Sequence, residues 1–146
     1  MKVLLQRVNY ASVKVDELVI SEINKGLLLL TGFGEGDDDS KLKPMAEKIV
    51  NMRIFPDEKS RFHFSLLDID GSVLVVPQFT LFADTGKGRR PEFLKALKPQ
   101  LARSLMDKFV CIFEQLGIKD VLSGQFGAYM KVELENDGPV TIMLEN

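Results

Sequence analysis

The amino-acid sequence predicts a single domain of the mixed α/β class, built around one curved or barrel-like sheet with two helices. Strand-like segments, roughly eight in number, cluster at both ends of the chain, and two longer segments carry apolar residues at helical spacing. The length of 146 residues and the hydrophobic fraction of 45% are ordinary for a globular protein that buries its own core. Residues 1–146 are therefore expected to form one domain.

The charge, the cysteine content and the distribution of apolar residues exclude several classes of protein. A net charge of −2 gives no overall basic field, so any contact with nucleic acid has to be local. The single cysteine, Cys111, cannot form an internal disulfide and fits a reducing compartment. The first residues, Met1 to Tyr10, have too short an apolar run for a signal peptide, and no run is long enough to cross a membrane. We expect a cytoplasmic protein that does not bind membranes.

The first third of the chain predicts four strands. Lys2–Val8 and Ala11–Val15 are two short strands, and Asp16-Glu17 is a tight turn into a third, Leu18–Ile23. The fourth, Gly26–Thr31, is an apolar run typical of a buried strand.

A glycine-rich loop, Gly32–Gly36, follows the fourth strand and precedes three aspartates, Asp37 to Asp39. Its glycine spacing is not that of a nucleotide-binding loop, and aspartates at the start of the next helix would repel a phosphate. We therefore interpret it as a plain flexible turn.

The first helix is predicted from apolar residues that recur every three or four positions. Pro44 has to lie in its first turn, so it should begin near Lys41 to Lys43, with Ser40 or Asp39 as its cap. Its expected buried face consists of Leu42, Met45, Ala46, Ile49 and Val50.

The second helix should start near Pro99 and stop at Gly117. Cys111 lies inside it with no histidine nearby in the sequence, so we interpret this cysteine as a packing residue rather than a nucleophile. The expected apolar face consists of Leu101, Leu105, Phe109, Ile112, Phe113 and Leu116.

The most unusual stretch follows the predicted strand Val73–Val76, whose four apolar residues indicate burial on both faces. Pro77 then removes a backbone donor where a central strand would need one. Gln78 and Thr80 follow at a period of two. A buried strand that leads into a proline, an amide and a hydroxyl indicates a functional segment.

The C-terminus predicts a hairpin. Met130 to Leu134 alternate apolar and charged residues, Asn136–Pro139 contains the Asp-Gly turn signal, and Val140–Leu144 would return alongside. The Gly138-Pro139 bond lies in this turn, which is where a cis peptide bond is most plausible.

Conventional catalytic groups are scarce. The single histidine, His63, alternates with Phe62 and Phe64 as a strand-edge residue would, and no second histidine or cysteine cluster suggests a zinc site. The loop Thr85–Pro91 carries three cations, Lys87, Arg89 and Arg90, and is typical of a solvated loop. An enzyme of this kind would have to use backbone groups, hydroxyls and its own substrate.

Five motifs, spread in order along the chain, resemble the D-aminoacyl-tRNA deacylases. They are QRV at Gln6–Val8, QFTLFAD at Gln78–Asp84, GRRPEF at Gly88–Phe93, FGAYM at Phe126–Met130 and NDGPVT at Asn136–Thr141. The resemblance implies that family's fold, with a curved, mostly antiparallel barrel-like sheet and two main helices. It also implies a homodimer that hydrolyses the ester between a D-amino acid and the 3′-terminal adenosine of tRNA. Such enzymes can also clear glycine from tRNA for alanine, and neither a cofactor nor a metal is expected.

The resemblance assigns catalysis to Gln78, Phe79 and Thr80. The backbone N–H groups of Phe79 and Thr80 are suited to an oxyanion hole. We interpret the Thr80 hydroxyl as a positioning group because no base is near to activate it, with the 2′-hydroxyl of the adenosine assisting the attacking water.

Substrate binding is assigned by the same resemblance to two separate segments. Gly138 and Pro139, joined by a cis bond, would enter the partner subunit's site, where their carbonyls hold the amino group and exclude an L side chain. Arg7 would lock their orientation. Phe126 and Met130 would line an adenine pocket, although core packing is the alternative for both.

Two positions depart from the family pattern. Pro77, which we also count among the expected substrate-binding residues, stands where the family usually has serine, which deletes a hydroxyl and an N–H at the edge of the site. Glu92 also stands at a usual serine position and adds a negative charge near the basic loop. Two alternatives to the deacylase remain at this point. One is a non-catalytic dimeric module that binds RNA 3′ ends or adenine nucleotides, and the other is a conventional thiol or serine hydrolase using Cys111 or His63.

Overall fold

One long strand, β1 (Lys2–Val15), organises the sheet in the computed structural model, which describes residues 1–86 and 88–146. It pairs antiparallel with β3 along its first half, with β2 along its second half and with β8 along nearly its whole length. The other strands are β2 (Leu18–Ile23), β3 (Gly26–Gly32), β4 (Phe55–Pro56), β5 (Phe62–Phe64), β6 (Ser72–Pro77), β7 (Val121–Ser123) and β8 (Lys131–Glu145). The helices are α1 (Leu42–Asn51) and α2 (Pro99–Gln115), with 3-10 turns η1 (Asp39–Lys41) and η2 (Phe79–Phe82).

The sheet curves into a nearly closed barrel. Its strand order is β2-β1-β3-β6-β7, in which β3, β6 and β7 run parallel to one another. The two ends of this order approach each other, because the Ser21 hydroxyl on β2 donates a hydrogen bond to the Ser123 carbonyl on β7 at 2.7 Å. The chain is therefore one mixed α/β domain, as predicted.

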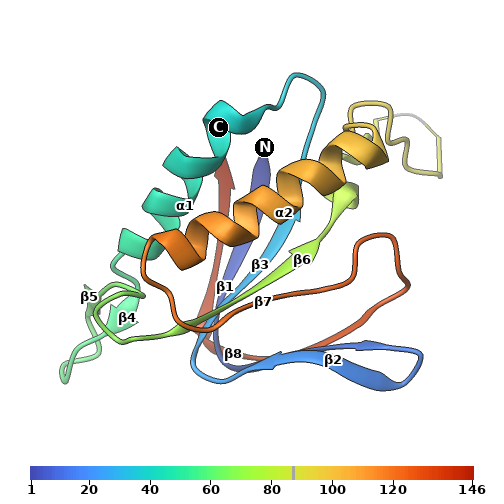
Figure 1. The fold of residues 1–146 in the computed structure, drawn as a ribbon. Coiled ribbons are helices and arrows are strands. Elements are labelled where there is room, and N and C mark those ends of the chain that lie inside the picture. Colours follow the sequence, from blue (N-terminus) through green and yellow to red (C-terminus); the bar gives the residue numbers. More distant parts are fainter. Residues whose placement is uncertain (87) are drawn as a thin grey trace.

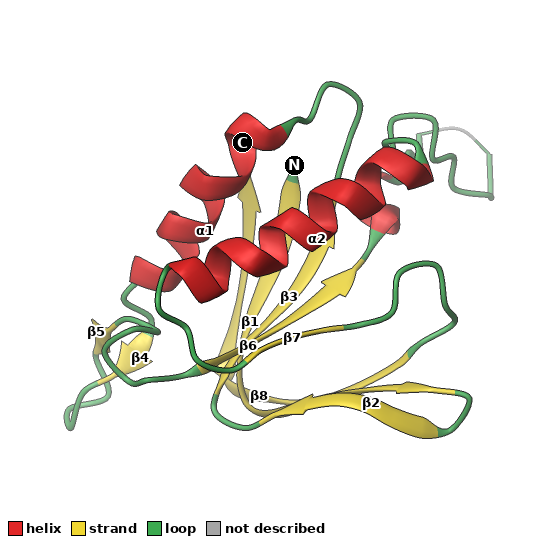
Figure 2. Ribbon diagram, in the orientation of Figure 1, coloured by secondary structure: helices red, strands yellow, loops and turns green. Residues whose placement is uncertain are grey.

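Both helices lie over the same face of the sheet (Figures 1 and 2), and a separate core fills the other face. Alternation along β3 supplies both cores: Leu27 and Leu29 face the helices, whereas Leu28 faces the second core. Val73 and Val75 of β6 face the helices in the same way, and Leu74 and Val76 face away from them. The prediction that the Val73–Val76 run is buried on both faces is confirmed.

The predicted boundaries need one change near the N-terminus. Lys2–Val8 and Ala11–Val15 form the single strand β1, whose pairing with β8 is irregular around Val8. The Asp16-Glu17 turn is confirmed, since both residues have the positive φ angles of a tight hairpin turn, 48° and 64°.

The prediction of a C-terminal hairpin is wrong. The residues before and after the Asp-Gly sequence belong to one strand, β8, which runs beside β1 from end to end. Gln6 pairs with Thr141 and Val8 pairs with Asn136, so Arg7 alone lies opposite the whole of 137–140. The segment bulges out of the ladder instead of reversing the chain, because pairing with β1 outweighs the local turn signal.

The helices begin and end close to their predicted positions. Neither Ser40 nor Asp39 caps α1: its first residue follows Lys41, which makes no side-chain capping bond. Asp38 caps the preceding turn η1 instead, where its Oδ1 accepts a hydrogen bond from the Ser40 amide at 2.9 Å. Pro99 is the first residue of α2, and Gly117, with a φ of 93°, follows its end.

Two side chains of α2 do not pack as predicted. Leu101 is 56% exposed and Cys111 is exposed, whereas the buried residues are Ala102, Leu105, Met106, Phe109 and Phe113. Cys111 lies two positions after Phe109, about 200° around the helix, and therefore faces solvent. In the described part of the chain, no helix has the length and apolar character that crossing a membrane requires.

Candidate active site

A pocket of about 520 Å³ opens at the carboxyl ends of the parallel strands β3 and β6. This is the edge at which open α/β sheets generally bind ligands. Thr31 and Gly32 come from β3, Val76 and Pro77 end β6, and Gln78 and Phe79 continue the same wall. The first half of α2 and the segment 126–130 form the other walls, through Pro99, Ala102, Met106, Phe126, Gly127, Ala128, Tyr129 and Met130.

The position of Pro77 explains why a central strand tolerates it. Along β6 the bonds to β7 alternate with the bonds to β3: the Val75 carbonyl accepts from Gly124, and the Gln78 amide donates to Thr31 at 2.7 Å. An N–H at residue 77 would point towards β7, but β7 has already ended at Ser123. The missing donor therefore leaves the ladder to β3 intact and marks the place where the strand becomes the pocket wall.

The predicted catalytic segment is the turn η2. Its first hydrogen bonds run from the Leu81 amide to the Gln78 carbonyl, at 3.3 Å, and from the Ala83 amide to the Thr80 carbonyl, at 3.0 Å. The amides of Phe79 and Thr80 precede these bonds, so the turn itself does not use them. The Gln78 side-chain amide donates to the Thr80 hydroxyl. Gln78 and Phe79 line the pocket, while Thr80 lies exposed directly after them.

Phe126 and Met130, the two residues that the resemblance assigns to an adenine pocket, both line this pocket. Each is half-buried: Phe126 also packs against the helix-side core, and Met130 packs against the second core. Core packing, the alternative for both residues, therefore also applies, but only to the sides of Phe126 and Met130 that face away from the pocket. Gly124 gives the Met130 thioether its space, because a Cβ at that glycine would lie 2.8 Å from Sδ.

Arg7, Gly138 and Pro139 form a second group, on the bulge of β8. Arg7 is 5% exposed, and its Nε donates to the Asp137 carbonyl at 2.9 Å, while its Nη1 donates to the Ile54 carbonyl at 2.5 Å. The Gly138-Pro139 peptide bond is cis and both residues are exposed.

Asn136 closes the bulge from its other side. Its Oδ1 accepts from the Val140 amide at 2.7 Å, and its Nδ2 donates to the Val140 carbonyl at 3.2 Å and to the Thr141 hydroxyl at 3.1 Å. One side chain therefore ties the two ends of the Asp137–Pro139 bulge together, so that a short exposed segment is fixed at its base.

The two groups of predicted site residues do not meet within one chain. Arg7 pairs with Leu27 at the start of β3, whereas the pocket begins at Thr31. Four residues along a strand correspond to roughly 13 Å. A single chain therefore presents the pocket and the Gly138-Pro139 segment at different ends of the sheet.

The charge of the pocket is as informative as its shape. Among the described residues, its lining contains no aspartate, glutamate, histidine, lysine or arginine. The described residues also hold no group of three or more His, Cys, Asp or Glu side chains that could bind a metal ion. His63 is exposed on the separate β4–β5 hairpin, and Cys111 is exposed on α2, so neither lines the pocket. Chemistry in this pocket has to come from backbone groups, the Gln78 amide, the hydroxyls of Thr31 and Tyr129, and the substrate.

The glycine-rich loop has a role that the sequence did not indicate. A Cβ at Gly34 would lie 2.3 Å from the Phe82 ring, so the loop packs against η2. The Leu97 amide donates to the Phe33 carbonyl and the Glu35 amide donates to the Lys95 carbonyl, both at 2.9 Å. The loop therefore holds the Ala96–Leu97 wall of the pocket. Alternating glycines after a buried strand are the signal of such a close approach.

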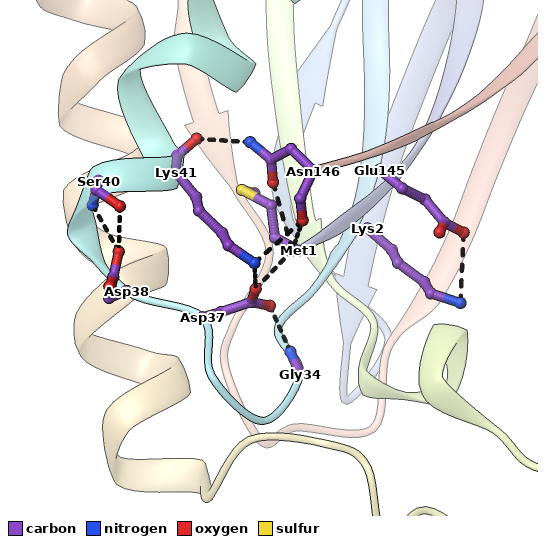
Figure 3. A network of polar contacts seen from close by, with 9 residues as sticks. All are labelled: Met1, Lys2, Gly34, Asp37, Asp38, Ser40, Lys41, Glu145 and Asn146. Carbon is purple, nitrogen blue, oxygen red and sulfur yellow. Dashed lines mark hydrogen bonds and ion pairs between the residues drawn. The ribbon is translucent and has the colours of Figure 1, made fainter.

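Asp37 anchors this loop (Figure 3). Its Oδ2 accepts from the Gly34 amide at 2.6 Å, and its Oδ1 accepts from the Met1 amino group and from Lys41 Nζ, each at 2.7 Å. Burial alone would raise the pKa of the Asp37 carboxyl, but the bonds from Lys41, the Met1 amino group and Gly34 hold that pKa below its ordinary value. Asp37 is therefore ionised at neutral pH and joins the loop to the first strand.

The loop after η2 is closed by a pair of backbone bonds. The Asp84 amide donates to the Glu92 carbonyl at 2.7 Å, and the Glu92 amide donates back at 2.9 Å. Arg89, Arg90 and the side chain of Glu92 are exposed. Lys87, the remaining cation of this loop, lies outside the described residues.

Comparison with known proteins accounts for these motifs. Residues 4–145 match the family model described as D-Tyr-tRNA(Tyr) deacylase. The D-aminoacyl-tRNA deacylase of Roseiflexus castenholzii is 53% identical over the whole chain and 92% of that protein, and the one of Clostridium perfringens is 47% identical over the whole chain and 97% of its own length. The solved structure of a c-Myc DNA unwinding element binding protein superposes with a TM-score of 0.93 at 38% identity, covering all of this chain and 99% of that one. The chain belongs to the D-Tyr-tRNA(Tyr) deacylase family.

Proposed function

We propose that this protein hydrolyses the ester bond of D-aminoacyl-tRNA, releasing the free D-amino acid and the tRNA. The observation that carries the proposal is the pocket at the ends of β3 and β6, which has an aromatic ring and a thioether on one wall and the start of η2 on the other. The family relationship and the names of the close relatives support the same activity. The substrate end that enters is the 3′-terminal aminoacyl-adenosine, with the adenine against Phe126 and Met130.

The reaction uses main-chain donors. As water attacks the ester carbonyl, negative charge develops on its oxygen, and the free amides of Phe79 and Thr80 stabilise that charge. The Gln78 side chain orients the Thr80 hydroxyl, which positions the ester instead of attacking it. Since the pocket lining described above has no carboxylate, histidine or lysine to act as a base, the 2′-hydroxyl of the terminal ribose assists the water.

Selection of D-residues requires a second copy of the chain. Gly138 and Pro139 of one subunit enter the pocket of the other. The dimer thereby brings together the pocket and the Gly138-Pro139 segment, which lie at different ends of the sheet within one chain. Their carbonyls hold the substrate amino group, and Arg7 and Asn136 keep the segment in place. With the amino group and ester both fixed, an L-residue places its side chain where a D-residue has hydrogen, and it collides with the segment. Glycine on tRNA for alanine has no side chain and is accepted.

Contact with the tRNA is confined to its acceptor end. A protein with a net charge of −2 can neutralise few phosphates, and the exposed Arg89 and Arg90 lie on the loop that follows η2. Pro77 leaves the pocket edge without the usual family hydroxyl, so no step is assigned to that position. The proposed place of action is the cytoplasm, without a membrane or a cofactor.

The test is deacylation of matched D-Tyr-tRNA and L-Tyr-tRNA by the purified protein. Release of D-tyrosine with little release of L-tyrosine is the expected result. Binding of either tRNA without release would instead indicate a module that only recognises RNA ends, and equal release of both would contradict chiral selection. Alkylation of Cys111 and a His63→Ala substitution are the controls for a conventional hydrolase, and neither should abolish activity.

A further inference from the structure

A second hollow, of about 330 Å³, adjoins the pocket and shares Pro77, Met106 and Phe126 with it. Phe126, one of the three residues that line both spaces, is called the partition. The remaining lining comes from the outer face of α2 and from residues 123–125 after β7. The Pro77 ring contributes an apolar wall on this side, since a Cβ at Gly124 would be 3.5 Å from its Cδ.

Two opposite charges on α2 line this hollow without pairing. Arg103 and Asp107 are one helical turn apart and both exposed. Within the described residues neither forms an ion pair, although Lys43 and Glu47 on α1 do so at the same spacing. The Arg103 guanidinium instead lies over the Phe126 ring, 5.8 Å from its centroid. Both side chains are therefore free to contact a ligand, and the Arg103 guanidinium already lies over the ring of Phe126.

The proposed substrate has a group of matching chemistry at this distance. An adenosine bound against Phe126 carries a phosphodiester on its 5′ oxygen, so the next nucleotide has to lie on a surface that adjoins the pocket. In tRNA that nucleotide is a cytidine, because the chain ends in CCA. A guanidinium binds a phosphodiester, and a carboxylate accepts a hydrogen bond from the exocyclic amine of cytosine.

We infer that this hollow is the subsite for the penultimate cytidine, with Arg103 on the phosphodiester and Asp107 on the cytosine amine. The assignment rests on the proposed function and adds a second nucleotide to it. It makes Asp107 a specificity residue, since uracil has a carbonyl where cytosine has the amine and would face the carboxylate without a donor. The Arg103 side chain would meanwhile remain stacked on Phe126 and so link the two subsites.

The experiment compares three small esters of one D-amino acid: the 3′-esters of adenosine, of the dinucleotide CpA and of the dinucleotide UpA. For the unmodified protein, kcat/KM should be highest for CpA, and it should exceed the value for UpA by roughly tenfold, the discrimination typical of one directed base contact. Asp107→Ala should bring the CpA and UpA values together. Arg103→Ala should lower both dinucleotide values towards that of adenosine, by about tenfold for a lost charged hydrogen bond. For each variant, the kcat/KM values of the three esters are compared as ratios to one another, so a general change in the activity of that variant cancels.

Glu114→Ala is the matched control, because it removes the same charge from α2 two turns further on, about 10 Å along the helix. It should leave all ratios as they are. Alanine favours the helix at each of these exposed positions, so the variants should fold, which circular dichroism and thermal unfolding would establish. Equal kcat/KM for the three esters, or a CpA preference that survives Asp107→Ala, overturns the assignment. Absence of hydrolysis of every D-ester and of D-Tyr-tRNA would instead refute the proposed function itself.

Discussion

Arg7 holds Asp137 by two contacts: its Nε lies 2.9 Å from the Asp137 carbonyl oxygen and 3.1 Å from the carboxylate Oδ2. The guanidinium is nearly buried, and its other end is fixed to the Ile54 carbonyl. The planar Arg7 guanidinium thus fixes the bulge that carries Gly138 and Pro139 through three contacts, two to Asp137 and one to Ile54. A lysine would keep the charge but not this geometry.

Arg7→Lys should therefore impair the proposed cross-subunit site more than the fold. Because a displacement of about 1 Å can cost on the order of a hundredfold in rate, we expect D-Tyr-tRNA deacylation to fall by that order. The ratio of D- to L-Tyr-tRNA cleavage should fall with it. Arg53→Lys, at an exposed position, is the control. An unchanged D/L ratio would show that the support of the bulge does not set selectivity.

Thr80→Ala should slow the reaction without abolishing it. Its hydroxyl is bonded to the Gln78 amide and not to a base, and the backbone donors stay in place after the substitution. We expect a loss between about tenfold and a hundredfold, smaller than that for removal of a nucleophile. Single-turnover kinetics measures the rate, and intact-mass spectrometry checks for an acyl-enzyme. A covalent adduct on Thr80 in the unmodified protein would contradict the positioning role.

Gly124→Ala should weaken binding more than it slows chemistry. The new Cβ would lie 2.8 Å from Met130 Sδ, so the flexible thioether has to move into the part of the pocket that we propose for adenine. The expected result is a several-fold higher KM with a smaller change in kcat. Thermal unfolding is the companion measurement. A large loss of stability at unchanged KM would mean that Met130 cannot move and that the backbone gives way instead.

The cross-subunit site predicts rescue between two inactive variants. Gly138→Ala alters a residue with a φ of 139° and places a Cβ 3.0 Å from Arg7 Nη2, and Phe126→Ala removes the partition of the pocket. When the two variants are mixed in equal amounts and refolded together, half of the dimers should be heterodimers. Each heterodimer has one intact site out of two, so about a quarter of the activity of the unmodified protein should return. Light scattering during size-exclusion chromatography should give the mass of a dimer. No recovery in a verified heterodimer would contradict a site assembled from two subunits.

Asp37→Asn should destabilise the protein and change its response to acid. The substitution leaves the Gly34 amide, Lys41 and the Met1 amino group without their carboxylate, at a cost of about 1–3 kcal/mol at pH 7. A carboxyl with a lowered pKa stabilises the fold above its unfolded value of about 3.9, and this contribution is lost as pH falls through the lower folded value.

Urea unfolding at pH 7 and pH 3 measures both effects. The difference in free energy of unfolding between the unmodified protein and Asp37→Asn should be smaller at pH 3 than at pH 7. Asp39→Asn is the control from the same run of aspartates, because its contact with Lys108 is exposed and should be worth less than about 1 kcal/mol. An equal gap at both pH values would show that Asp37 does not act through its charge.

Local sequence patterns predicted elements better than their connections. The period-two alternation of 130–134 identified a strand, and the apolar spacing of 99–117 identified α2. The Asp-Gly signal failed in the bulge because the pairing of β8 with β1, which joins opposite ends of the chain, decides the geometry there. Cys111 was misplaced for a different reason, since the helical period itself puts it opposite Phe109.

The site was predicted in parts. Motifs named Gln78, Phe126 and Met130, which line one pocket, and also Arg7 and Gly138, which lie together elsewhere. The wall at Ala96–Leu97 carries no motif, because its position depends on hydrogen bonds to a loop more than 60 residues away in sequence, such as the Leu97 amide to Phe33. Met106 belongs to the same category, as its place in the pocket depends on how α2 crosses the sheet.

The absence of carboxylate, histidine and lysine side chains from the described pocket lining has a consequence for how the proposed activity is lost or kept in evolution. Side-chain substitution can delete a catalytic histidine or aspartate in one step, but an amide N–H belongs to every residue except proline. The donors at Phe79 and Thr80 would survive replacement of either side chain as long as η2 keeps its shape. Under the proposed mechanism, selection acts on the conformation of a turn, and sequence drift at the centre of the site is compatible with a constant reaction.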